Sequence, residues 1–180
     1  DELGLRENTI VIFSSDHGYL LGHHNKFQKQ HLFEESTRVP FILSVPWMSD
    51  SHGTASGHLT ELVDLYPTVA RLAGLTPPAS IQGQSLLPIL KDPSTKLWTK
   101  DLAFTISRSG GESIRTPDWR FIHWGFGTKG NELYDRKNDP HEFTNLAKDP
   151  KYADRLEQLK ARLKTKRKEA GYNPKRYKLK

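Results

Sequence analysis

The pattern of apolar and polar positions predicts two short strands near the start of the chain. Residues 9–13 (TIVIF) and 41–45 (FILSV) are continuous apolar runs rich in β-branched side chains. Such runs are typical of strands that are buried on both faces. They favour a parallel or mixed sheet covered by helices, and the polar stretch 14–38 between them is the first place to look for function.

The next apolar segments predict helices. Residues 64–74 fit a helix because Asp64 can cap its start, Pro67 falls in its first turn and Gly74 can end it. Residues 83–90 form a shorter apolar segment. Helices are therefore expected after the second predicted strand.

The pattern changes beyond residue 101. Short strand-like segments separated by turn residues occupy 102–106, 112–115, 119–124 and 132–134. This spacing predicts antiparallel strands joined by tight turns, with a subdomain boundary near 93–101. From Tyr152 onward, leucines recur at helical spacing until Gly171 and Pro174, so a helix is expected to close the chain.

Composition excludes several classes of site. The 180 residues are 35% hydrophobic and contain no Cys, which excludes disulfides, thiolate zinc sites, iron–sulfur clusters and a cysteine nucleophile in this chain. No apolar run approaches the length of a transmembrane helix. The first residue is Asp1 and the single Met is Met48, so we expect that processing or truncation removed the natural start.

The net charge of +6 is concentrated at one end. Residues 151–180 carry 12 Lys or Arg and 3 Asp or Glu, a local charge of +9, whereas the other 150 residues have a charge of −3. We interpret the basic segment as a solvated amphipathic helix with cations near its C-terminal carbonyls. A module that binds polyanions such as acidic glycans is the alternative.

A chemically suggestive group follows the first predicted strand. Asp16, His17 and Gly18 are followed thirteen residues after Asp16 by Lys29. Carboxylate and imidazole can bind a divalent cation, and glycine permits a sharp turn. Taken alone, the same three residues fit a turn in which the Asp accepts hydrogen bonds from local amides.

A series of segments lies in a characteristic order along nearly the whole chain: 9–18, 21–25, Lys29, 32–41, 63–70, 83–87, 113–120, 132–142 and 145–147. In these segments the sequence resembles the sulfatase family of the alkaline phosphatase superfamily, in particular iduronate-2-sulfatase and its bacterial relatives. The resemblance implies an α/β fold: the C-terminal part of an alkaline-phosphatase-like mixed sheet with flanking helices (1–96), a small antiparallel subdomain (97–150) and a basic C-terminal helix and tail (151–180).

The resemblance also implies roles for individual residues. It makes Asp16 and His17 ligands of an active-site Ca²⁺ and Lys29 the residue that contacts the sulfate ester. Ca²⁺ prefers oxygen ligands, so His17 could instead orient the nucleophile. His24 lies where relatives have a histidine and is a candidate for substrate binding, with a packed loop histidine as the alternative.

Other side chains are weaker candidates. Tyr19 and His31 could line a sugar site, and Arg115 is the basic residue of its region best suited to carboxylate or sulfate recognition. Glu34 and Glu35 are expected to cap a helix or pair with Arg38. The remaining histidines, 52, 58, 123 and 141, have no supporting spacing.

Sulfatases of this type use a formylglycine nucleophile made in a Cys/Ser-x-Pro-x-Arg motif, which is absent here because Ser44-Val45-Pro46-Trp47 continues to Met48. We therefore expect the C-terminal portion of a larger sulfatase acting on a sulfated uronate or glycosaminoglycan, inactive without its N-terminal portion. Periplasmic, secreted or lysosomal location follows from the resemblance. A phosphatase or phosphodiesterase of the same superfamily is the alternative enzyme, and no nucleic-acid partner is expected.

Overall fold

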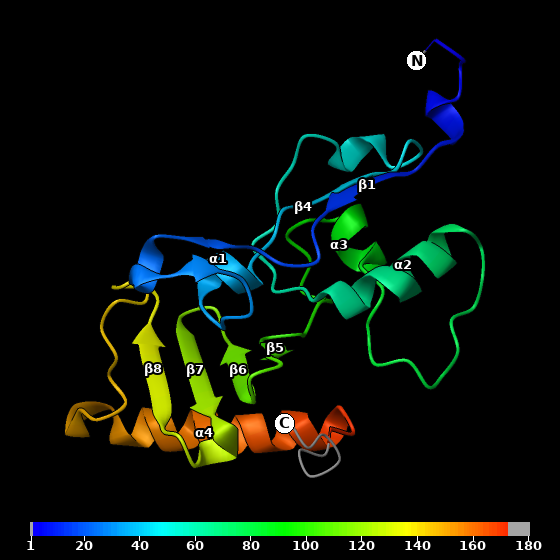
Figure 1. Ribbon diagram of the computed structural model, residues 1–180. Helices are drawn as coiled ribbons and strands as arrows, with labels where there is room; N and C mark the ends of the chain where they lie inside the picture. The colour runs from blue at the N-terminus through cyan, green and yellow to red at the C-terminus, as the bar shows by residue number, and fades with distance from the viewer. Residues whose placement is uncertain (1, 173–180) are drawn as a thin grey trace. The chain divides into compact units, whose positions relative to one another are not determined.

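The computed structural model describes residues 2–172 and is a mixed α/β structure with small antiparallel sheets (Figure 1). The chain divides into two compact units. The first unit combines Asp1–Asp16 with Val39–Lys100, and the second combines His17–Arg38 with Asp101–Lys180. These two units differ from the three consecutive domains predicted from the sequence, 1–96, 97–150 and 151–180. The three-domain division stays a prediction. No helix in residues 2–172 is long and apolar enough to cross a membrane.

The first unit contains both predicted buried strands. β1 (Val11–Ser14) and β4 (Phe41–Ser44) pair antiparallel, with Phe13 opposite Ile42. The strand positions are confirmed, but the expected burial on both faces is not found. Phe13 is 59% exposed and Ile42 is 60% exposed. Within residues 2–172 this sheet consists of two strands, and a two-stranded ribbon buries little of its own apolar surface.

The helices of the first unit follow the predicted signals. η4 (Leu62–Asp64) leads into α2 (Leu65–Leu72), and Gly74 has the positive φ of 75° that suits a glycine after a helix. α3 (Leu87–Lys91) is followed by Trp98, which packs with Leu86, Ile89 and Phe41 in a small core. The short 3₁₀ helices η1 (Arg6–Asn8) and η3 (Ser49–Ser51) complete this unit.

A buried carboxylate organises the start of α2. The Asp64 side chain is fully buried, accepts hydrogen bonds from the Glu61 and Gln84 amides, and is 2.6 Å from Lys100 Nζ. Lys100 also binds Glu61 at 2.8 Å. The prediction that Asp64 caps α2 is wrong, because its side chain makes no capping hydrogen bond to that helix. Its carboxylate instead closes the capping box of η4 by accepting a hydrogen bond from the Glu61 amide at 2.8 Å. The ion pair with Lys100 adds a contact across 36 residues.

The second unit contains the predicted antiparallel sheet. Its four strands pair in sequence order: β5 (Ala103–Ile106), β6 (Gly111–Arg115), β7 (Trp119–Trp124) and β8 (Asn131–Asp135). Each predicted strand overlaps an observed one to within two residues at either end. The 3₁₀ helix η5 (Gly125–Gly127) lies in the β7–β8 connection.

Both faces of this sheet are covered. On one face Ile114, Phe121 and Leu133 pack against Leu159 and Leu163 of the C-terminal helix α4 (Ala153–Glu169), which follows η6 (Pro150–Tyr152) (Figure 1). On the other face the segment His17–Arg38 supplies Leu20, Leu32 and Phe33, which pack with Ile122 and Tyr134. Alternation along β7 therefore sends neighbouring side chains into two separate cores.

The segment His17–Arg38 is irregular, with only short elements. It contains the two-stranded pair β2 (Leu20–Leu21) and β3 (Phe27–Gln28), the 3₁₀ helix η2 (His23–Asn25) and the single-turn helix α1 (Glu34–Thr37). Its buried leucines and Phe33 attach it to the four-stranded sheet. Between these anchors the loop alternates partly buried residues, such as His24, with exposed ones, such as Lys29.

The basic helix α4 packs through its apolar stripe, as predicted, and several of its cations are engaged in ion pairs. Arg167 binds the fully buried Glu112 through Nε at 2.7 Å and through a second guanidinium nitrogen, and Arg162 binds Asp101 at 2.6 Å. Gly171 has a φ of 61°, as expected after a helix. The last eight residues, 173–180, which include Pro174, lie outside the described part of the chain.

Candidate functional site

Asp16 and His17 lie where β1 ends and the second unit begins. Asp16 is exposed, two residues after β1. The His17 ring donates a hydrogen bond from Nδ1 to the Gly18 carbonyl oxygen at 2.8 Å. Because a carbonyl can only accept, Nδ1 carries the proton, and in the neutral ring Nε2 then has the lone pair that binds metals.

Gly18 is required by close packing and not by its backbone angles. A Cβ at this position would lie 1.8 Å from the Glu35 carbonyl oxygen. The Gly18 amide also donates to the Ser36 carbonyl oxygen at 2.9 Å. These contacts fix the backbone next to His17 against helix α1, so any side chain at residue 18 would displace the loop.

Lys29 lies in the exposed loop directly after β3. Within residues 2–172 it makes no ion pair with a carboxylate. The neighbouring loop positions are held by local hydrogen bonds, since Tyr19 donates to the Phe27 carbonyl at 3.2 Å and Gln28 donates to His31 Nε2 at 2.5 Å. The Lys29 ammonium is thus available to an anionic ligand.

His24 has a packed ring. It stacks on Phe33 with 3.7 Å between ring centroids and 6° between planes, and its backbone has a φ of 54°. Its Nε2 is buried and has no hydrogen-bond partner within the described residues. The stacking matches the packed alternative, whereas the unpartnered nitrogen leaves a polar group for a ligand, so substrate binding by His24 stays a prediction.

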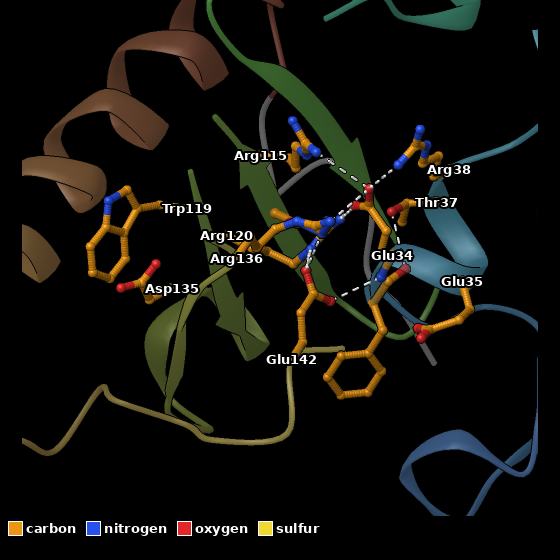
Figure 2. A network of polar contacts seen from close by, with 12 residues as sticks. Glu34, Glu35, Thr37, Arg38, Arg115, Trp119, Arg120, Asp135, Arg136 and Glu142 are labelled. Atoms are coloured by element: carbon orange, nitrogen blue, oxygen red, sulfur yellow. Dashed lines mark hydrogen bonds and ion pairs between the residues drawn. The ribbon is translucent and has the colours of Figure 1, made fainter. Parts of the chain in front are cut away.

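A buried network of charges joins α1 to the sheet (Figure 2). The Arg120 guanidinium is 1% exposed and contacts Glu34, Glu142 at 2.5 Å and Ser113 at 3.2 Å. The Glu142 carboxylate in turn accepts a hydrogen bond from the Glu34 amide at 2.9 Å. A buried cation is tolerated only when it is paired in this way.

Glu34 is the centre of this network. Beyond Arg120, it binds Arg136 at 3.1 Å, Arg115 at 3.4 Å and the exposed Arg38 at 3.6 Å. The predicted pairing with Arg38 is confirmed. Arg115, expected to be a candidate for anion recognition, is engaged with this carboxylate instead.

The network shifts the pKa values of its carboxyl groups in opposite directions. Burial would raise the pKa of Glu34, but the three neighbouring arginines hold it below its usual value. For Glu142, burial dominates over Arg120 and Arg136, and its pKa is raised. Burial also lowers the pKa of Arg136. These shifts reflect structural pairing and involve none of the predicted catalytic groups.

Sequence reasoning missed a group of three possible metal ligands. His23, Glu35 and His141 each place one ligand atom within 4.8 Å of those of the other two. His141 had no supporting spacing because it follows β8, far from the other two in sequence. The hydrogen bond from the Glu34 amide to Glu142 joins residues 108 positions apart, so the local sequence pattern could not predict it either.

Comparison with known proteins identifies a family. Residues 22–169 match the family described as N-sulphoglucosamine sulphohydrolase, C-terminal. An N-acetylglucosamine-6-O-sulfatase of Bacteroides thetaiotaomicron is 33% identical over 88% of this chain and 30% of its own length. A Delta 4,5-hexuronate-2-O-sulfatase of the same organism is 36% identical over 87% of this chain and 34% of its own. The chain therefore spans about a third of these relatives.

Solved structures agree with this match. A 2-O GAG sulfatase superposes with a TM-score of 0.78 at 34% identity, covering 90% of this chain and 36% of the other. A structure in complex with its substrate D-glucosamine-2-N,6-O-disulfate gives 0.77 at 28%, covering 99% and 37%. A phosphonate monoester hydrolase of Agrobacterium radiobacter gives 0.79 at 26%, covering 91% and 36%.

Proposed function

Since this chain belongs to the sulfatase family and corresponds to its C-terminal portion, we propose that it forms part of an enzyme that hydrolyses sulfate esters of a sulfated uronate or glycosaminoglycan-type glycan. The observation that carries the proposal is the 36% identity to a hexuronate 2-O-sulfatase along 87% of the chain. The relative solved with a disulfated glucosamine supports a sulfated sugar as the ligand class.

Lys29 is the proposed catalytic cation. Its exposed position in the loop after β3 lets the ammonium contact a sulfate oxygen directly. Negative charge grows on the leaving oxygen as the S–O bond breaks, and a fixed positive charge stabilises that change. The anchoring of the loop by Leu20, Leu32 and Phe33 limits how far this ammonium can move, and His24 would contact the sugar beside it.

Asp16 and His17 fit half of a divalent metal site, with Ca²⁺ the proposed ion. Asp16 offers a carboxylate as a ligand. The Nδ1–H of His17 donates a hydrogen bond to the Gly18 carbonyl oxygen at 2.8 Å, which leaves Nε2 as the ring nitrogen that can bind a metal. A bound divalent cation would supply positive charge near the sulfate group. Asp16 is the better ligand for Ca²⁺, and His17 either completes the site or orients the nucleophile.

The rest of the active site is proposed to come from the remaining sulfatase portion. That portion would contain the formylglycine nucleophile and the other acidic metal ligands, so the 180-residue chain alone would be inactive. The coverage of only 30–34% of the curated relatives supports this division. We place the whole enzyme in the periplasm, the lysosome or outside the cell, in line with the sulfatase resemblance.

Phosphate or phosphonate ester hydrolysis is the second candidate. It is favoured by the TM-score of 0.79 to the phosphonate monoester hydrolase, which is 26% identical to this chain. The two chemistries share an anionic tetrahedral group and differ in metal preference, with calcium expected for the sulfatase and two zinc ions for the phosphatase. The sulfatase relatives have the higher identity, at 36% and 34%.

A polyanion-binding module is the least supported alternative. Arg162 and Arg167 of α4 are already paired with Asp101 and Glu112, which leaves fewer cations for a polyanion. Because α4 is part of the sheet's core, the test is heparin retention of the wild type and of a variant in which the exposed Lys164 and Lys168 are both changed to Gln. Equal retention would remove this alternative.

The decisive experiment uses the full-length gene product. Sulfate release is measured by ion chromatography from unsaturated hexuronate-2-sulfate disaccharides, with a phosphonate monoester as the competing substrate and the 180-residue chain as a control. We expect sulfate release by the full-length enzyme only. Faster hydrolysis of the phosphonate ester would favour the second candidate, and turnover by the isolated chain would contradict the proposed division of the active site.

A further inference from the structure

The geometry points to a second metal site in the second unit: His23, Glu35 and His141 bind a zinc-class divalent cation. The ligand atoms of all three lie within 4.8 Å of one another. None of them belongs to the proposed set of Asp16, His17 and Lys29. Two imidazoles and one carboxylate are a donor set that suits Zn²⁺ and later transition metals, whereas Ca²⁺ and Mg²⁺ favour oxygen alone.

The distances fit metal coordination after small side-chain rotations. His23 Nδ1 is 2.6 Å from Glu35 Oε1, and the rings of His23 and His141 are 5.6 Å apart at 80°. Ligand atoms around tetrahedral zinc are about 3.3 Å apart, given bonds of about 2.0–2.1 Å. The hydrogen-bonded pair must open slightly and the third ligand must approach. His141 is exposed and the His23 side chain is 44% exposed, so both rings can turn.

Glu35 has an unused acceptor at this position. Its Oε2 is buried and has no hydrogen-bond partner within residues 2–172. A buried carboxylate oxygen without a partner loses hydration without compensation. Metal coordination through Oε2 would supply that compensation.

The charge network holds two of the three ligands, Glu35 and His141, in place. Glu35 directly follows Glu34 in the sequence, and His141 directly precedes Glu142. The Glu34 amide donates a hydrogen bond to the Glu142 carboxylate at 2.9 Å, which ties the two positions together. In Figure 2, Glu35 lies on α1 beside Glu34 with its carboxylate apart from the arginine cluster. Preorganisation of this kind lowers the cost of assembling ligands from distant parts of the sequence.

The third ligand is held by its own loop. His23 begins η2, where the Lys26 amide donates to the His23 carbonyl at 3.1 Å and the Gly22 amide donates to the Lys26 carbonyl at 2.9 Å. Phe143 lies beside both rings, with centroids 6.1 Å from His23 and 5.8 Å from His141. The site therefore has a fixed backbone and an apolar side.

The test is zinc titration of the untagged, EDTA-treated 180-residue chain. We expect one equivalent of Zn²⁺ to bind, with affinity at least tenfold lower in His141→Ala and unchanged in the control His58→Ala, which removes a histidine from the first unit. Addition of millimolar Ca²⁺ should not displace the zinc. Circular dichroism of His141→Ala checks folding, and His141→Gln replaces it if that variant is unfolded.

Cobalt substitution reads the ligands directly. Bound Co²⁺ should show visible absorption bands typical of four-coordinate nitrogen and oxygen ligation, and these bands should be lost in His23→Ala. Absence of zinc binding by the wild-type chain, equal affinity in His141→Ala, or an equal loss in His58→Ala would each overturn the site. Because the readout is metal affinity, failure here leaves the proposed sulfatase activity unaffected.

Discussion

The four-stranded sheet and the β1–β4 pair differ in how their apolar side chains are covered. The four-stranded sheet of the second unit has a core on each face, with Phe121 and Ile122 both fully buried. The β1–β4 pair of the first unit exposes Phe13 and Ile42 by 59% and 60%. An apolar sequence therefore indicates a strand, but the surrounding chain decides whether that strand is buried.

The charged residues show the same contrast. In the second unit, Arg120, Arg115 and Arg136 form a largely buried cluster with two carboxylates, and the exposed Arg38 lies at its edge. In the first unit, Lys100 pairs with the two carboxylates of Asp64 and Glu61. Loss of one member should cost more in the larger cluster, because more buried charge is left without a partner.

The largest effect on stability is expected from Arg120→Ala. This change removes the more buried of the two cations that bridge Glu34 and Glu142, leaving Arg136 as their remaining common partner. It should lower the free energy of unfolding by about 3–5 kcal/mol. Urea denaturation measures it. The control is Arg38→Ala, whose side chain is 74% exposed and should cost less than about 1 kcal/mol. Equal effects of the two changes would contradict the account.

A matched pair of phenylalanines compares the two sheets directly. Phe121→Ala removes a fully buried ring and should cost about 3–5 kcal/mol. Phe13→Ala removes a ring that is 59% exposed, and its cost in the 180-residue chain should stay near 1 kcal/mol. Both values come from denaturant unfolding followed by circular dichroism. A cost for Phe13→Ala as large as that for Phe121→Ala would show that the β1–β4 face is covered in solution.

An intermediate effect is expected from Asp64→Asn. The amide keeps the shape but removes the charge that faces Lys100 at 2.6 Å, while Glu61 still binds the ammonium at 2.8 Å. We expect a loss of about 1–3 kcal/mol in the free energy of unfolding. The variant Asp50→Asn, at an exposed carboxylate in the same unit, is the control and should unfold like the wild type.

The smallest effect concerns pH. Burial lowers the pKa of His123 below its usual value of about 6.5. The unfolded chain therefore takes up a proton at this residue before the folded chain does, and stability should fall as pH drops through 6.5 toward the lowered value. The slope cannot exceed about 1.4 kcal/mol per pH unit for one proton. Denaturation of His123→Gln at several pH values should give a flatter dependence, and an unchanged slope would exclude this residue as the cause.

Local pattern was enough to predict most of the fold. The strands from 102 to 134 follow alternation and turns, and α2 is followed by the predicted terminal glycine, Gly74. The predicted capping by Asp64 falls on η4 and not on α2. The pairing of β1 with β4 could not be predicted, because a short apolar run does not specify its neighbour or its direction. Burial of the run could not be predicted for the same reason.

The candidate site divides in a similar way. Asp16, His17 and Lys29 lie within one short segment and could be singled out from the sequence. The Glu34–Arg120–Glu142 network and the contact of His141 with His23 join residues that are close only in the folded chain. Gly18 was expected to serve a turn, but its essential feature is the approach of the Glu35 carbonyl, which no spacing reveals.

The most direct test of the sulfatase account is the kcat/KM of full-length Lys29→Ala and Lys29→Arg for hexuronate-2-sulfate disaccharides. If the Lys29 ammonium stabilises the departing oxygen, Lys29→Ala should lower kcat/KM by about 10²–10³-fold, Lys29→Arg should recover part of it, and the exposed control Lys148→Ala should match the wild type. Wild-type kcat/KM in Lys29→Ala would contradict the account.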